Sequence, residues 1–166
     1  MNPSRIGSRT HDYKRHGTAA LYAAFNTLTG KVIGKVADKT NGKAFLSFLK
    51  LLNRRVSADK DLHIILDNLS AHKTPAVREW LEAHPRIHLR FTPTSSSWLN
   101  AVEGWFAQLE RRAFYRGVFT SVPELKAELQ RFISVHSAHN AKPFQWTKPA
   151  GHIIAAAGRA KHALQN

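Results

Sequence analysis

The hydrophobic pattern along this chain changes repeatedly between the two-residue period of a strand and the 3.6-residue period of a helix. Strand-like patterns lie at residues 18–26, 31–36, 62–66 and 86–91. Helical patterns lie at residues 41–55, 73–83, 98–112 and around 125–133. This order of strand, strand, helix, strand, helix, strand, helix and helix predicts an α/β layer fold.

Local signals refine five of these segments. Residues 27–30 form a turn between the first two strands, which predicts an antiparallel hairpin. The run at 62–66 is rich in β-branched residues and leucine, which is typical of a parallel strand buried on both faces. We expect Asn41 to cap the helix that follows the hairpin, and Pro75 to fit the first turn of the next helix.

The chain carries far more positive than negative charge. It has 166 residues, which suits one domain, with 25 Lys and Arg against 11 Asp and Glu and a formal net charge of +14. Such a field attracts polyanions, so nucleic acid is the expected partner, although ribosomal and structural proteins can be equally basic. The chain has no cysteine, which excludes disulfides and thiolate metal sites. Without an apolar run of membrane-spanning length or a signal peptide, we expect a cytoplasmic protein that contacts no membrane.

Two carboxylates stand out against this basic background. Asp67 follows the apolar run at 62–66, and Glu103 lies on the polar side of the helix at 98–112. Because a carboxylate after a buried strand and one on a nearby helix can converge, both are candidate ligands of a divalent metal ion. Simpler interpretations stay open, with Asp67 as a turn or capping residue and Glu103 as an ordinary solvated residue. His72 could bind a metal or a phosphate, but a loop histidine is more often a surface or capping residue.

Aromatic residues near Glu103 and near the C-terminus allow two interpretations. Trp98, Trp105 and Phe106 could stack on nucleic-acid bases, but their spacing favours the core. Phe144 and Trp146 could contact DNA, but packing against the sheet is the favoured role. We therefore place these aromatic side chains in the core.

Several separated blocks of sequence carry a resemblance to one family. They are residues 10–17, Leu66-Asp67-Asn68 with His72-Lys73, FTPTSSSWLNAVEGWF at 91–106, and residues 140–147. Together they resemble the catalytic domain of bacterial insertion-sequence transposases, which belong to the DDE endonuclease group related to the mariner superfamily. The resemblance runs through almost the whole chain.

This resemblance implies a ribonuclease H-like fold with a mixed central sheet flanked by helices. It divides the chain into a basic N-terminal arm at 1–17, a catalytic domain at 18–149, and a C-terminal helix and tail at 150–166. The family's first catalytic Asp lies on an initial strand before the segment matched by residues 10–17. We therefore expect the chain to lack that strand and the family's N-terminal helix-turn-helix, as a truncated transposase or the second product of a split reading frame.

The resemblance also implies residue roles. It places the second acidic ligand at Asp67 and the third at Glu103, in a site that holds two Mg²⁺ ions, with Mn²⁺ as an alternative. Supporting roles are expected for Asn68, His72 and Asn100. Contacts with DNA phosphates are expected from basic side chains, namely Arg9, Lys14, Arg15, Lys73, Arg90, Arg111, Arg112 and Arg116.

The implied function is DNA transposition by metal-dependent phosphodiester cleavage and strand transfer. Its partners would be double-stranded DNA, as transposon ends and target, and either a second copy of the chain or an upstream transposase half. The implied location is the bacterial cytoplasm, in association with the nucleoid. With the first Asp missing, we expect the chain to be inactive alone. Two alternatives stay open: a non-catalytic DNA-binding or regulatory fragment, and a Mg²⁺-dependent nuclease of the same fold.

Overall fold

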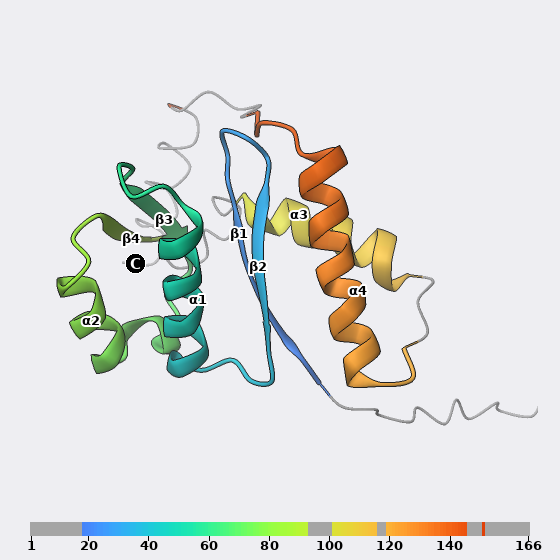
Figure 1. The fold of residues 1–166 in the computed structure, drawn as a ribbon, viewed down its shortest axis with the longest axis horizontal. Coiled ribbons are helices and arrows are strands. Elements are labelled where there is room, and N and C mark those ends of the chain that lie inside the picture. The colour runs from blue at the N-terminus through green and yellow to red at the C-terminus, as the bar shows by residue number, and fades with distance from the viewer. Residues whose placement is uncertain (1–17, 93–100, 116–118, 146–150, 152–166) are drawn as a thin grey trace, which may run out of the picture.

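A computed structural model describes residues 18–92, 101–115, 119–145 and 151, and its fold is a mixed α/β arrangement (Figure 1). The strands are β1 (Ala20–Phe25), β2 (Val32–Ala37), β3 (Leu62–Leu66) and β4 (Ile87–Phe91). The helices are α1 (Gly42–Arg55), α2 (Pro75–Glu82), α3 (Val102–Leu109) and α4 (Val122–Val135). A 3-10 turn at Ser70–Lys73 precedes α2, and π-helical turns at Glu110–Phe114 and His136–Asn140 extend α3 and α4. The predicted order of elements is confirmed across the described residues.

Strands β1 and β2 form the predicted antiparallel hairpin. In its turn, the Asn26 side chain accepts hydrogen bonds from the backbone N–H groups of Leu28 and Thr29. Gly30 has a φ of 72°, and a Cβ there would collide with the backbone of Lys142. The hairpin therefore needs glycine at residue 30, both for its conformation and for the close approach of the chain that follows α4.

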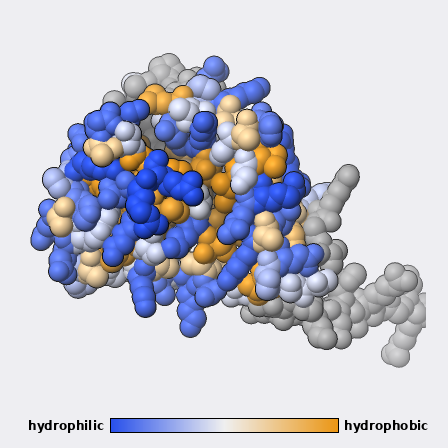
Figure 2. Space-filling view, viewed as in Figure 1, coloured by the Kyte–Doolittle hydropathy of each residue, from blue (hydrophilic) through white to orange (hydrophobic). Residues whose placement is uncertain are grey.

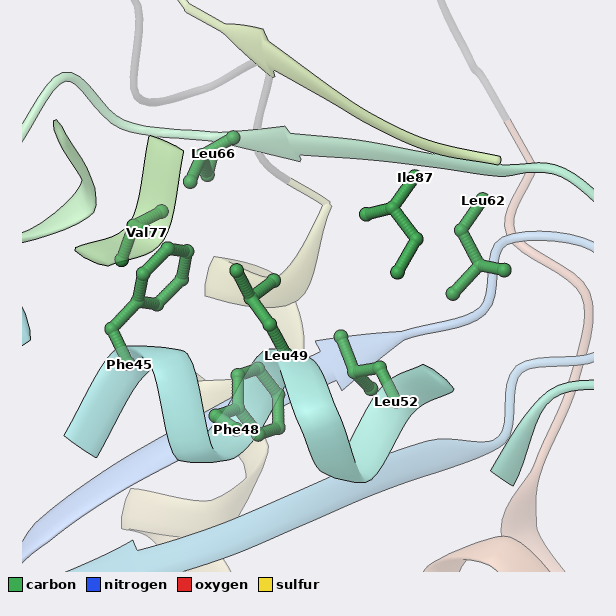
Figure 3. Packing of buried hydrophobic residues seen from close by; sticks show 8 residues of the cluster. All are labelled: Phe45, Phe48, Leu49, Leu52, Leu62, Leu66, Val77 and Ile87. Carbon is green, nitrogen blue, oxygen red and sulfur yellow. The ribbon is translucent and has the colours of Figure 1, made fainter. Parts of the chain in front are cut away.

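Helix α1 joins the hairpin to the second strand pair. Its N-cap is Asn41, as predicted, whose side chain accepts a hydrogen bond of 2.9 Å from the Ala44 N–H. The buried face of α1 meets β3, β4 and α2 in one core, formed by Phe45, Phe48, Leu49, Leu52, Leu62, Leu66, Val77 and Ile87 (Figure 3). Tyr22, Ala24 and Ile33 of the hairpin also pack against this core, so α1 holds the two strand pairs together.

The opposite face of the hairpin packs against α3 and α4. This second core contains Val32, Trp105, Leu109, Ala113 and Leu129. Figure 1 accordingly places α1 on one side of the hairpin and α3 and α4 on the other. The Trp105 side chain is only 1% exposed, which confirms the core role predicted for it, and Phe106 packs beside it.

Strands β3 and β4 pair in parallel, as predicted, but β3 is not buried on both faces. Leu62 and Leu66 are buried, whereas His63 is exposed and Ile65 is 52% exposed. The prediction of two buried faces was wrong because α1 and α2 pack on one face only, among the described elements. An apolar run gives the propensity for a strand, but it does not determine how many faces its neighbours cover.

Several other expectations concern segments outside the described residues. They include the arm at 1–17, the residues that begin the expected helix at 98–112, Trp146, and almost all of the C-terminal segment at 150–166. Phe144 is described, and its ring lies edge-on to that of Phe25 in β1, with 6.2 Å between the ring centroids. This contact confirms that Phe144 packs against the sheet. In the described part of the chain, every helix is too short or too polar to cross a membrane.

Candidate active site around Asp67

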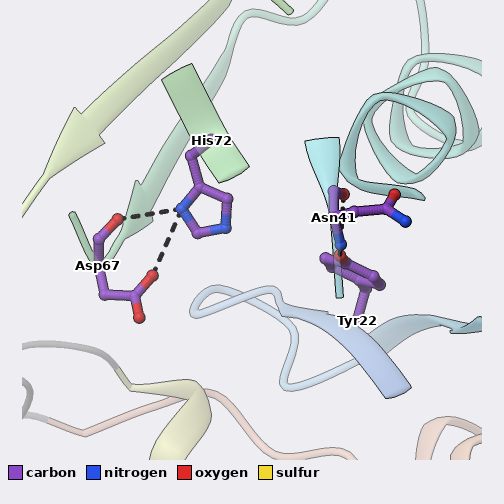
Figure 4. A network of polar contacts seen from close by, with 4 residues as sticks. All are labelled: Tyr22, Asn41, Asp67 and His72. Atoms are coloured by element: carbon purple, nitrogen blue, oxygen red, sulfur yellow. Dashed lines mark hydrogen bonds and ion pairs between the residues drawn. The ribbon is translucent and has the colours of Figure 1, made fainter. Parts of the chain in front are cut away.

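Asp67 lies directly after β3, at the carboxyl end of the parallel strand pair. Its side chain is 53% exposed, and one carboxylate oxygen lies 3.4 Å from Nδ1 of His72. The same Nδ1 lies 3.1 Å from the backbone oxygen of Asp67 (Figure 4). Both neighbours of Nδ1 are acceptors, so this nitrogen carries a proton and donates to Asp67. Asp67 therefore presents a solvent-accessible carboxylate with the His72 ring on one side.

His72 is buried, at 8% exposure, in the 3-10 turn that follows β3. Its ring centroid lies 4.2 Å from that of Phe45, in the core beneath α1. The expectation of a surface histidine was wrong, because the turn folds back and buries the ring against Phe45. The bond from Nδ1 to a backbone oxygen is compatible with the alternative of a capping residue. A buried donor beneath an exposed carboxylate is a positioning arrangement, since the donor's rotamer is fixed by packing.

A second polar contact joins Tyr22 of β1 to Asn41, the N-cap of α1 (Figure 4). The Tyr22 hydroxyl donates to the backbone oxygen of Asn41 and accepts from the Asn41 N–H, both at 3.2 Å. The Tyr22 ring also lies 6.3 Å from Phe45, which contacts His72. Contacts between these rings thus link β1, the start of α1 and the turn that follows Asp67.

Glu103 lies in the first turn of α3 and is exposed, while the next core residue of that helix, Trp105, is buried. The predicted orientation of Glu103 away from the core is therefore confirmed. No hydrogen bond or ion pair links Glu103 to Asp67 among the described residues, and their convergence on one ion stays a prediction. Within the same residues, neither carboxylate belongs to a group of three close metal-ligand side chains.

The basic residues predicted to contact DNA are partly described. Lys73 is exposed beside Asp67's turn, with its Nζ 5.0 Å from the ring centroid of Phe91. Arg90, Arg111 and Arg112 are exposed, as is the supporting residue Asn68. The remaining predicted residues lie outside the described part of the chain: Arg9, Lys14, Arg15, Arg116 and Asn100.

Hydrophilic side chains cover much of the face seen in Figure 2, and apolar atoms appear in the hollow between α1 and α4. Residues of β2, α1 and α4 line an open groove there, including Ile33, Leu51 and Ile133, with Arg55 as its charged member. None of the predicted site residues lines this groove. The groove is therefore separate from the candidate site at Asp67 and Glu103.

Comparison with known proteins supports the sequence-based resemblance. The chain is similar to the insertion element IS630 uncharacterized 39 kDa protein of Shigella sonnei, with 26% identity over 117 residues. That match covers 70% of this chain and 34% of the relative, so the chain spans about a third of its length. A solved structure, a simian T-cell lymphotropic virus intasome in complex with PP2A regulatory subunit B56 gamma, contains a similar chain with 16% identity and a TM-score of 0.44. This similarity covers 90% of the present chain and 65% of the matched chain.

The family comparison covers most of the chain. The DDE superfamily endonuclease family matches residues 2–126, a span that contains the hairpin, both parallel strands, Asp67, His72 and Glu103. Since the family match includes both carboxylates and the turn that orients one of them, the chain belongs to the DDE superfamily endonucleases.

Proposed function

We propose that this chain supplies Asp67 and Glu103 to the metal-dependent DNA-cleaving site of an insertion-element transposase. The observation that carries the proposal is the exposed Asp67 carboxylate at the end of a parallel strand, oriented by the buried His72. The family match and the similarity to an insertion-element protein support the same function.

The residues present fit a hard divalent cation such as Mg²⁺, for which carboxylate oxygens are preferred ligands. A donor on His72 occupies one side of the Asp67 carboxylate, and the 53% exposure leaves room for a cation on the other. Mg²⁺ or Mn²⁺ bound there would stabilise negative charge at the scissile phosphate and lower the pKa of the attacking hydroxyl. Asp67 and Glu103 would hold the cations, and Lys73 and Arg90 would neutralise neighbouring phosphates.

The strand arrangement supports a ribonuclease H-like fold in this proposal. The described strands form two separate pairs, β1 with β2 and β3 with β4, although α1 packs against both in a shared core. One further strand between β1 and β3 would join them into a single mixed sheet. A carboxylate on that strand would lie beside Asp67 and provide the third acidic ligand of the site.

The electrostatics favour DNA as the substrate. The formal net charge of +14 attracts a polyanion, and four of the basic residues predicted to contact phosphates are exposed in the described structure. In this function the catalytic domain would span residues 18–149, act on transposon ends and target DNA beside the nucleoid, and pair with a second copy or with another transposase half.

The test is a supercoiled-plasmid nicking assay with Mg²⁺ or Mn²⁺. We expect little cleavage by the 166-residue chain alone, and cleavage by a version extended at its N-terminus with an Asp-bearing strand. In the active version, Asp67→Asn and Glu103→Gln should each abolish nicking. Asp38→Asn and Glu79→Gln, which change exposed acids elsewhere, should leave it intact. Nicking that survives both Asp67→Asn and Glu103→Gln would contradict the proposal.

The same assay distinguishes the two alternative functions. DNA binding without cleavage in the extended version would favour a regulatory fragment. Cleavage without joining of the cut 3′ ends to a target duplex would favour a nuclease of the same fold. Cleavage with joining supports the transposase.

A further inference from the structure

A second group of potential metal ligands lies at the opposite end of β3 from Asp67. Asp61 directly precedes β3, His63 is its second residue, and His88 is the second residue of β4. One ligand atom from each of these three side chains lies within 4.8 Å of the other two. Among the described residues, this is the only such group of three His, Cys, Asp or Glu side chains.

The strand geometry explains why these three residues meet. Asp61 and His63 are two residues apart, so their side chains emerge on the same face of an extended segment. His63 pairs with His88 in the parallel register, which places the two rings side by side with centroids 4.6 Å apart and planes 16° apart. Among the described elements, no helix covers this face of β3, which lies opposite the α1 core, and here Asp61 and His63 are exposed and His88 is half-buried.

The side chains of this group are available for a ligand. Asp61 has no hydrogen bond or ion pair with any residue in the described part of the chain. The nearby guanidinium of Arg86 is instead bonded to the Asn53 side chain and to backbone oxygens of α1 and the following loop. No described cation therefore neutralises the Asp61 carboxylate, which stands beside two imidazoles.

We propose that Asp61, His63 and His88 form a binding site for a zinc-class divalent cation. Two imidazole nitrogens and one carboxylate oxygen are a typical zinc ligand set, with a fourth position left to water. Tetrahedral Zn²⁺ at bond lengths near 2.05 Å needs ligand atoms about 3.3 Å apart. The exposed side chains of Asp61 and His63 can close the remaining distance, about 1.5 Å or less, by rotamer adjustment without moving the strands.

This site differs from the proposed catalytic site in position and in chemistry. His63 and Asp67 are four residues apart, which is roughly 13 Å along an extended strand. The nitrogen-rich group favours Zn²⁺, Ni²⁺ or Cu²⁺, whereas the carboxylates Asp67 and Glu103 favour Mg²⁺ or Mn²⁺. A cation held by His63 and His88 would cross-link β3 to β4 and thereby stabilise the parallel pair.

The test is isothermal titration of the metal-free, untagged 166-residue chain with Zn²⁺ in the presence of excess Mg²⁺. We expect one specific equivalent of Zn²⁺ and a rise in the melting temperature on binding. His63→Ala, His88→Ala and Asp61→Asn should each weaken Zn²⁺ binding by at least about tenfold, since even outer-shell changes commonly cost this much. The matched control is His139→Ala, which removes an exposed histidine outside the group and should leave binding unchanged.

Two further measurements separate a loss of Zn²⁺ binding from a loss of folding. Melting in EDTA should give the Asp61 and His63 variants and the wild type similar stabilities, because these two side chains are exposed. Visible absorption of bound Co²⁺ should show the intense bands of a four-coordinate site in the wild type and lose them in His63→Gln. Equal Zn²⁺ affinity in wild type and His63→Ala, or full displacement of Zn²⁺ by Mg²⁺, would overturn the proposal.

Discussion

At the scale of single residues, His72 combines two roles, because its ring fills the core while its Nδ1 donates to Asp67. We expect His72→Ala to lower the free energy of unfolding by about 2–3 kcal/mol, the cost of a cavity beneath α1. Urea denaturation would measure this loss. His139→Ala, at an exposed histidine, should change the same free energy by less than about 0.5 kcal/mol. A similar small change in His72→Ala would mean that the core does not depend on this ring.

His72 also affects the proposed active site, because its Nδ1 lies beside both the backbone oxygen and the carboxylate of Asp67. In His72→Ala, the half-exposed Asp67 carboxylate would lose its buried neighbour and gain rotational freedom. In the proposed site, His72 would therefore act as a positioning residue, and Asp67 would be the residue that binds the cation.

At the scale of elements, the N-terminus of α4 is stabilised by three hydrogen bonds between residues 120–124. The Ser121 hydroxyl accepts from the Glu124 N–H, and the Glu124 carboxylate accepts from the Thr120 N–H and hydroxyl, both at 2.9 Å. This arrangement resembles a capping box, in which side chains bond to backbone N–H groups that lack helical partners. The bond from the Thr120 N–H, followed by that from its hydroxyl, lowers the pKa of Glu124 below its ordinary value of 4.5.

A pH dependence of stability follows for α4. Because the folded-state pKa of Glu124 is lowered, its stabilising contribution is present above the unfolded pKa and is lost as the pH falls through the folded value. We expect Glu124→Gln to be less stable than wild type at pH 7, with the difference shrinking as the pH is lowered towards 3. Free energies of unfolding across this range would test it. A pH-independent difference for Glu124→Gln would contradict this expectation.

At the scale of the whole molecule, the net charge of +14 would govern the binding of DNA in the proposed function. Binding to phosphates releases counterions, so affinity should fall steeply with salt. If the four described candidates, Lys73, Arg90, Arg111 and Arg112, each neutralise one phosphate, the plot of log K against log salt should have a slope of about −3.6. Fluorescence anisotropy with a duplex at several salt concentrations would measure the slope, and we expect little preference for sequence.

Charge-removing variants sharpen this prediction. Replacing Arg111 and Arg112 together by Gln should reduce the magnitude of the slope by about 1.8. Arg131 is a matched control, because Glu128 already binds its guanidinium through two hydrogen bonds of 2.7 and 2.6 Å. Arg131→Gln should therefore alter the slope much less, and an equal effect from all three arginines would show that the contacts are not localised.

The sequence by itself determined the features that arise within a short stretch of chain. Period-two and period-3.6 patterns predicted the described strands and helices, and Asn41, as the N-cap, and Pro75 marked where α1 and α2 begin. Hydrogen bonds of caps and turns join residues only a few positions apart, so residue type is enough to predict them. The family resemblance, since confirmed, also depends on sequence alone and identified Asp67 and Glu103 as site candidates.

Only the tertiary structure decided which of these residues are covered and which meet. The apolar run of β3 did not reveal that His63 and Ile65 face outward, because coverage depends on helices that pack from elsewhere in the chain. The loop position of His72 did not reveal its burial against Phe45 of α1, 27 residues earlier. Likewise, His63 meets His88 only through the register of two strands joined by a helix. Burial and pairing are set by the packing of distant segments, which a local pattern does not encode.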